Sequence, residues 1–90
     1  MKALSDAYAR AALNCIARLE HDWRTVDKIA CLIHGDDGFD CTEESAMSEL
    51  RRGLLALERD GALERAKDWR DGRSVKYRVT DKGRRRADGL

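Results

Sequence analysis

The feature that most constrains this sequence is a change in the spacing of its apolar residues after Gly61. Before that glycine, apolar residues recur every three or four positions, which is typical of amphipathic helices. Over residues 74–80 they alternate with polar residues, and this two-residue period is typical of a half-buried strand. The pair Asp71-Gly72 separates this segment from residues 62–69 and favours a tight turn between two antiparallel strands. The chain therefore combines helices with a short β-hairpin.

Four helices are expected around this hairpin, over residues 4–19, 26–34, 42–59 and 81–87. Thr25 can cap the second helix, and Gly35 is a natural signal for its end. Asp40 and Glu43 have the spacing of a capping box before the third helix, and Asp81 can cap the last one. Three helices, a two-stranded ribbon and a short final helix form the layout of a winged helix-turn-helix in the α+β class. The whole chain, residues 1–90, is expected to be one such domain.

The two halves of the chain carry opposite net charges, although the total is only +1. Residues 1–50 contain five Lys and Arg against ten Asp and Glu, a net charge of −5. Residues 62–90 contain ten basic against five acidic residues, a net charge of +5. A basic end of this kind favours a nucleic-acid partner, although clustered cations also serve solubility alone.

Several functional classes are not supported by the composition. No apolar run approaches the roughly 18 residues of a membrane span, and the first residues lack a signal-peptide core, so a cytoplasmic protein is expected. Three cysteines, an odd number without framework spacing, favour a reducing compartment over a disulfide scaffold. The sequence has no serine-histidine-acid set and no phosphate-binding glycine loop, so an enzyme is not expected.

Two segments resemble a known family. Residues 54–65, LLALERDGALER, are similar to the L-x-x-L-E-x-x-G-L-[IV]-x-R segment that ends a recognition helix and enters the wing. Residues 77–84, YRVTDKGR, are similar to the Y-x-[LV]-T-x-x-G-R segment that closes the wing. Both occur in the PadR and MarR groups of bacterial and archaeal winged-helix regulators, and the resemblance covers about half the chain. The sequence lacks the long dimerisation helices and the effector domain of those groups, so a minimal relative is expected.

Ten residues are predicted to contact DNA. In a winged helix-turn-helix, the third helix (here residues 42–59) lies in the major groove, and the wing (residues 62–80) contacts the minor groove or the backbone. Amides at the start of the second helix can hold a phosphate. The outward-facing residues of the third helix, the basic residues of the wing and the start of the second helix supply the predicted contacts, which are Thr25, Lys28, Ser45, Ser48, Arg51, Arg52, Lys67, Arg70, Arg73 and Lys76.

The expected function is that of a sequence-specific transcription regulator that binds double-stranded DNA, acts as a repressor and needs no cofactor or small-molecule effector. The alternative is a winged helix that binds another protein and not DNA. Glu49 favours this alternative because it lies on the reading helix and repels phosphate, and Arg51 and Arg52 could simply pair with Glu58 or other helix neighbours. A repressor is favoured over an activator, and the sequence defines neither the operator nor the target gene.

A homodimer is expected from the first helix. Its polar side is a narrow stripe, and apolar residues cover most of the remaining circumference, so the helix needs two packing partners. One would be the rest of the domain, and the other would be the same helix of a second subunit. The residues predicted to form the dimer contact are Leu4, Ala9, Leu13 and Ala17.

The remaining candidate site combines cysteine, histidine and aspartate. Cys31, His34 and Cys41 form a C-x2-H-x6-C pattern with aspartates between them. These are ordinary zinc ligands, but the spacing matches no structural zinc pattern closely, so no metal site is predicted. A redox role is open for Cys41, which lies near the start of a helix, whereas Cys15 and Cys31 are expected to be buried and inert.

Overall fold

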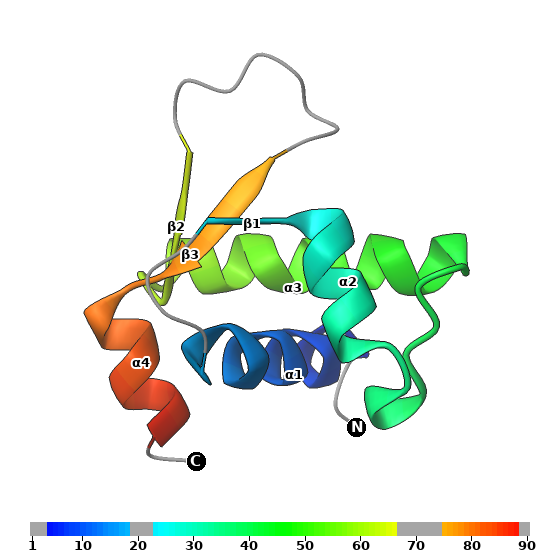
Figure 1. The fold of residues 1–90 in the computed structure, drawn as a ribbon, viewed down its shortest axis with the longest axis horizontal. Coiled ribbons are helices and arrows are strands. Elements are labelled where there is room, and N and C mark those ends of the chain that lie inside the picture. Colours follow the sequence, from blue (N-terminus) through cyan, green and yellow to red (C-terminus); the bar gives the residue numbers. More distant parts are fainter. Residues whose placement is uncertain (1–3, 19–22, 67–74, 89–90) are drawn as a thin grey trace.

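The computed structural model describes residues 4–18, 23–66 and 75–88, and these form a domain of the expected α+β class (Figure 1). In chain order the elements are α1 (Leu4–Arg18), β1 (Arg24–Thr25), α2 (Val26–Ile33), the 3-10 turn η1 (Asp36–Gly38), α3 (Glu44–Arg59), β2 (Leu63–Arg65), β3 (Lys76–Val79) and α4 (Asp81–Asp88). The four predicted helices are confirmed within about two residues at the ends that are described. None of the helices described is both long enough and apolar enough to cross a membrane.

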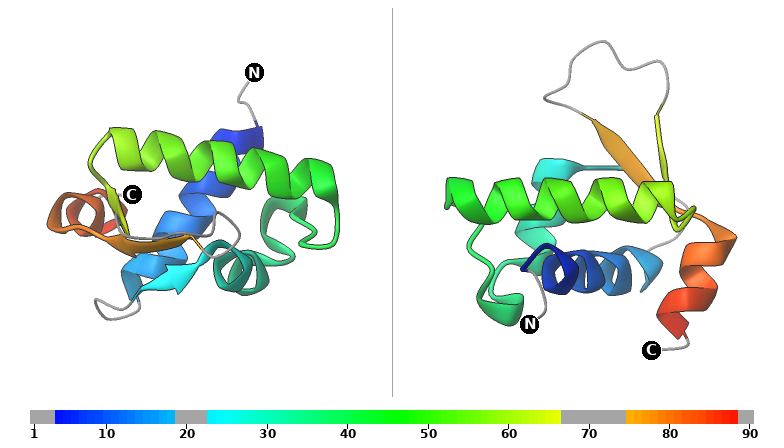
Figure 2. Two further views of the ribbon diagram at one scale, coloured as in Figure 1. Left: turned by 90° about the horizontal axis from the view of Figure 1, so that it is seen from above. Right: turned by 180° about the vertical axis from the view of Figure 1, so that it is seen from behind.

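Helices α1 and α3 pack directly against each other, as the views from above and behind show (Figure 2). Gly53 permits this close approach: a Cβ atom at this position would lie 2.5 Å from the backbone oxygen of Ser5 and 2.8 Å from Cβ of Ala9. Ala9 and Leu13 are buried as a result. The apolar side of α1 that was expected to contact a second subunit therefore partly covers α3 of the same chain.

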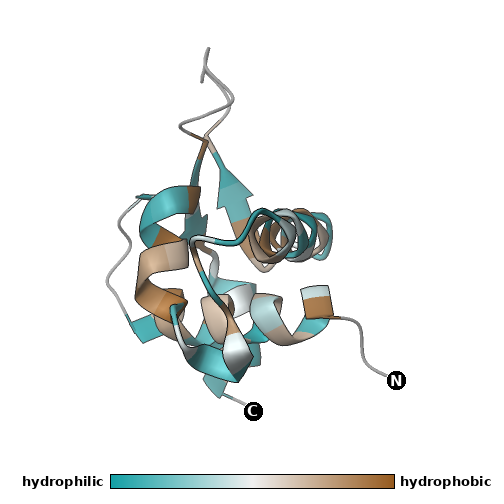
Figure 3. Ribbon diagram, turned by 90° about the vertical axis from the view of Figure 1, so that its right-hand side faces the viewer, coloured by the Kyte–Doolittle hydropathy of each residue, from teal (hydrophilic) through white to brown (hydrophobic). Residues whose placement is uncertain are grey.

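The core lies among α1, α2 and α3. Phe39 is 1% exposed, and its ring meets that of Tyr8 edge to face with centroids 4.9 Å apart. Leu50, Leu54 and Leu57 of α3, which recur at the helical spacing seen in the sequence, are buried, whereas Met47 is only half-buried. Figure 3, in which α3 is viewed end-on, shows both hydrophilic and hydrophobic residues around this helix, consistent with one buried and one exposed face.

The sheet has three antiparallel strands in the order β1-β3-β2, one more than the predicted ribbon. Leu63 of β2 lies opposite Val79 of β3, and Arg24 of β1 lies opposite Tyr77. Tyr77 and Val79 are buried on the predicted face. The central strand is therefore the one whose alternation is clearest in the sequence.

Two predicted helix caps are wrong. The carboxylate of Asp40 accepts hydrogen bonds from the backbone N–H of Thr42 at 2.9 Å and from its hydroxyl at 2.6 Å, so it closes a local turn and does not cap α3. Glu43 occupies the N-cap position without a side-chain hydrogen bond. At α4, the hydroxyl oxygen of Thr80, and not Asp81, accepts the N–H of Gly83 at 3.1 Å. At α4 the neighbouring Thr80 therefore satisfies an amide that was assigned to Asp81. At α3 no side chain replaces the predicted cap, and the N–H of Glu43 donates to the backbone carbonyl of Asp40 at 3.1 Å.

Candidate nucleic-acid interface

One side of α3 is free of core contacts. We call it the outer face of α3 and define it by Ser45, Ser48, Arg51, Arg52 and Leu55, all of which are exposed. The four residues predicted from this helix to contact DNA lie on it together, and Leu55, 43% exposed, is an apolar member that was not predicted. Short hydroxyls, guanidinium groups and an apolar side chain can bind base edges, phosphates and thymine methyl groups, respectively.

Arg52 is paired within its own helix. Its Nη1 lies 3.7 Å from Oε1 of Glu49, and the Arg52 side chain is 72% exposed. The expected alternative, Glu58, instead pairs with Arg65 at 3.5 Å. Exposed ion pairs of this kind are worth about 0–1 kcal/mol, so the guanidinium of Arg52 can exchange Glu49 for a phosphate at small cost.

A groove of about 230 Å³ separates the outer face of α3 from the sheet. Apolar side chains form most of it, and two guanidinium groups and one carboxylate lie among them. Its lining residues are Val26, Asp27, Arg51, Leu54, Leu55, Arg65, Val75 and Tyr77. Burial, followed by the nearby Glu58, raises the pKa of Tyr77 and keeps its hydroxyl neutral at physiological pH.

The start of α2 differs in part from the prediction. The hydroxyl oxygen of Thr25 accepts the N–H of Lys28 at 3.1 Å, which confirms the predicted cap. The N–H of Val26, however, donates to the carbonyl of Val75 at 3.2 Å. That amide is therefore not free to bind a phosphate as expected, and the exposed side chain of Lys28 is the group that this end of α2 offers.

The predicted wing residues fall into two groups. Lys67, Arg70 and Arg73 lie outside the described residues. Lys76 is half-buried on β3, where its backbone lies opposite Thr25.

A basic group of the sheet was missed in the sequence. The Nε and Nη2 atoms of Arg78 donate to the Oε2 atom of Glu64 at 3.0 and 2.9 Å, and its guanidinium lies 4.6 Å from the ring centroid of Trp23. Glu64 and Arg78 lie directly opposite each other on β2 and β3, and opposite charges at such positions in the predicted hairpin could have indicated this pair. Its geometry stabilises the sheet and leaves little of Arg78 for a ligand.

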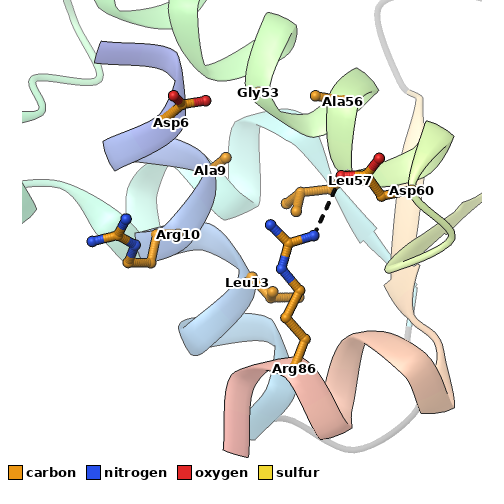
Figure 4. A pocket seen from close by; sticks show the side chains of 9 residues that line it. All are labelled: Asp6, Ala9, Arg10, Leu13, Gly53, Ala56, Leu57, Asp60 and Arg86. Carbon is orange, nitrogen blue, oxygen red and sulfur yellow. Dashed lines mark hydrogen bonds and ion pairs between the residues drawn. The ribbon is translucent and has the colours of Figure 1, made fainter. Parts of the chain in front are cut away.

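The residues predicted for dimerisation are divided between the core and the surface. Ala9 and Leu13 are buried and lie at a cleft of about 340 Å³ between α1, α3 and α4, whose lining also includes Arg10 and an ion pair of Arg86 with Asp60 at 3.3 Å (Figure 4). Leu4 is 57% exposed and Ala17 is half-buried. Of the four residues, Leu4 offers the most surface to a second subunit.

Only part of the C-x2-H-x6-C pattern comes together in the structure. His34, Asp40 and Cys41 form a cluster, to which Cys31 does not belong. The expected burial of Cys31 is wrong, because this residue lies on the exposed side of α2. Burial, together with the nearby Asp36, raises the pKa of the Cys15 thiol, in line with its expected inertness.

Comparisons of the chain with protein-family models, with curated proteins and with solved structures found no match.

Proposed function

We propose that this chain is a winged helix-turn-helix domain that binds double-stranded DNA and regulates transcription as a repressor. The single observation that carries the proposal is the outer face of α3, where two hydroxyls and two arginines are exposed on one helix and have no role in the core. The element order, in which α3 is followed by β2 and β3, supports the winged-helix assignment because the antiparallel pair occupies the position of a wing.

In the proposed complex, α3 lies in the major groove. Ser45 and Ser48 contact base edges or phosphates near its N-terminus, and Arg51 and Arg52 contact guanine or phosphate. Lys28 adds a phosphate contact from α2. The segment between β2 and β3, which includes Lys67, Arg70 and Arg73, contacts the minor groove or the backbone.

We further propose that the protein acts as a homodimer through α1, with Leu4 as its main exposed contact. Two copies of α3 would then lie about 34 Å apart, one turn of DNA, over a palindromic site. Sedimentation of the wild type and of Leu4→Asp tests this part, since the variant is expected to be monomeric at concentrations at which the wild type is a dimer.

The first test is binding to random-sequence duplex DNA, measured by fluorescence anisotropy at about 50 and 200 mM salt. The wild type is compared with Arg51→Ala/Arg52→Ala and with the control Arg10→Ala/Arg18→Ala, which removes the same charge from exposed positions of α1. The wild type is expected to bind with micromolar affinity that falls as salt rises. The α3 double variant is expected to bind DNA at least about tenfold more weakly, and the slope of log affinity against log salt concentration is expected to be smaller by about two. The affinity of the control variant is expected to change little.

Two results would contradict this proposal. Absence of binding at the lower salt concentration would favour the alternative, a winged helix that binds another protein, which the acidic Glu49 on α3 also favours. Equal losses of DNA affinity in the two double variants would indicate that DNA is attracted by the net charge of the protein alone, without a role for the outer face of α3.

A further inference from the structure

Three potential metal ligands meet at the turn that joins α2 to α3. His34 directly follows α2, and Asp40 and Cys41 lie four and three residues before the first residue of α3. One donor atom of each residue lies within 4.8 Å of the donor atoms of the other two. The set contains one nitrogen, one oxygen and one sulfur, a combination that suits a borderline divalent cation such as Zn²⁺.

The backbone of the turn brings these donors together without a metal ion. Gly35 has a φ of 94°, which reverses the chain after α2, and its N–H donates to the carbonyl of Phe39 at 2.8 Å. The N–H of Phe39 donates in turn to the carbonyl of Asp36 at 2.9 Å. Because the Phe39 side chain is anchored in the core, His34 and Asp40 are held near each other by packing and hydrogen bonds.

The histidine and the aspartate both act as hydrogen-bond acceptors in this turn. The Nδ1 atom of His34 accepts the N–H of Cys41 at 3.2 Å, so the lone pair that a metal ion would use is directed into the turn. Two hydrogen bonds from Thr42 lower the pKa of Asp40, which is therefore a carboxylate at neutral pH. Both bonds end on Oδ1, and Oδ2 accepts no hydrogen bond from any described residue.

We propose that His34, Asp40 and Cys41 form a binding site for Zn²⁺, with a water molecule as the fourth ligand. The donors of a tetrahedral zinc ion lie roughly 3.5 Å apart, so the present cluster must contract by about 1 Å. The His34 and Asp40 side chains are 53% and 41% exposed and are free to make this movement. Binding exchanges the hydrogen bond from Cys41 N–H to His34 for a metal–nitrogen bond and releases the thiol proton of Cys41 to solvent.

This inference goes beyond DNA binding and does not depend on it. A metal ion at these residues would link the end of α2 to the segment that leads into α3, and it would stabilise the folded chain by mass action. It also revises the expectation from sequence that no metal is bound, because the predicted pattern counted Cys31 and gave Asp40 no specific role.

The experiment is a titration of the reduced, metal-free protein with Co²⁺, which replaces Zn²⁺ and gives an intense thiolate-to-metal absorption band when a cysteine sulfur is bound. Competition with a chromogenic chelator then gives the Zn²⁺ affinity. The variants are Cys41→Ser and His34→Ala, and the matched controls are Cys31→Ser and Cys15→Ser. Circular dichroism of each metal-free variant verifies that it is folded.

The wild type and both cysteine controls are expected to show the thiolate band with one metal ion per chain. Cys41→Ser is expected to lose the band, and both site variants to bind Zn²⁺ at least about tenfold more weakly. A band that survives in Cys41→Ser, a band that disappears in Cys31→Ser, or equal Zn²⁺ affinity in wild type and His34→Ala would overturn the proposal. If Cys41→Ser does not fold, His34→Ala with its Zn²⁺ affinity decides the question alone.

Discussion

The two faces of α3 differ in burial, as two neighbouring leucines show. Leu54 is 0% exposed and belongs to the hydrophobic core, whereas Leu55 is 43% exposed and lies on the outer face with Arg51 and Arg52. We call the buried side of α3, formed by Leu50, Leu54 and Leu57, its inner face. The inner face packs in the core and stabilises the domain, whereas the outer face contributes almost nothing to the core. One helix therefore supplies both the stability of the fold and the surface that we propose binds DNA, and substitutions on the two faces are expected to have separable effects.

The largest expected effect is that of Leu54→Ala, compared with Leu55→Ala. The buried truncation removes transfer free energy and leaves a cavity, so it is expected to lower the free energy of unfolding by about 2–5 kcal/mol. The exposed truncation is expected to change it by less than about 1 kcal/mol. Urea denaturation of the two variants measures the difference. Similar losses in the free energy of unfolding at both positions would contradict the division of α3 into an inner face and an outer face.

The inner face was largely predictable from the sequence because apolar residues at helical spacing leave one arrangement that buries them. Leu50, Leu54 and Leu57 have this spacing, and all three are buried. Ala9 and Leu13 were assigned to a dimer contact because the sequence shows only that α1 is apolar on two sides, not which neighbour covers each side. Gly53 in the middle of α3 was the available signal, since a glycine inside a helix often permits close packing.

Features that depend on a few polar contacts were harder to predict. Strand β1 has two residues and no alternation to detect, and it exists because the sheet offers it the free edge of β3. The position of Asp40 in the sequence suits both a cap of α3 and a local turn. Its hydrogen bonds from Thr42 show that it closes the turn. The outer face of α3 was predictable as a set of exposed residues, but the pairing of Arg52 with Glu49 depends on side-chain geometry.

A smaller loss of stability is expected for Gly53→Ala. On an exposed helix position this change would gain about 1 kcal/mol from helix propensity. Here the new Cβ would collide with the backbone oxygen of Ser5, which cannot rotate away, so a net loss of about 1–3 kcal/mol is expected. Ala56→Gly, at an exposed position one turn later, serves as the control and is expected to cost about 1 kcal/mol through propensity alone. A stabilised Gly53→Ala variant would show that α1 and α3 are not in such close contact.

Beside the outer face of α3, where Glu49 pairs with Arg52, Glu49→Gln is expected to strengthen DNA binding. The change removes a carboxylate that repels phosphate, and it frees Arg52 from an exposed pair worth at most about 1 kcal/mol. Affinity is therefore expected to rise by up to about fivefold at low salt, with little change in the free energy of unfolding. Glu58→Gln, which breaks the pair with Arg65, is the matched control and is expected to have a weaker effect. An unchanged or reduced affinity in Glu49→Gln would exclude this part of α3 from the interface.

The smallest expected effect concerns the segment that leads into α3, which belongs to neither face. Hydrogen bonds from Thr42 lower the pKa of Asp40, so its carboxylate stabilises the folded state above its ordinary pKa, and this contribution is lost as the pH falls through the lowered value. Asp40→Asn lacks this titration, so the stability difference from wild type is expected to shrink between about pH 7 and pH 3. Urea midpoints measured with a chelator present, to keep the proposed zinc site free, provide the test. Asp37→Asn in the same turn is the control, because asparagine tolerates its φ of 52° and its side chain has no hydrogen bond within the described residues. A pH-dependent difference as large as the loss in Leu54→Ala would show that this turn, and not the inner face of α3, dominates the stability of the domain.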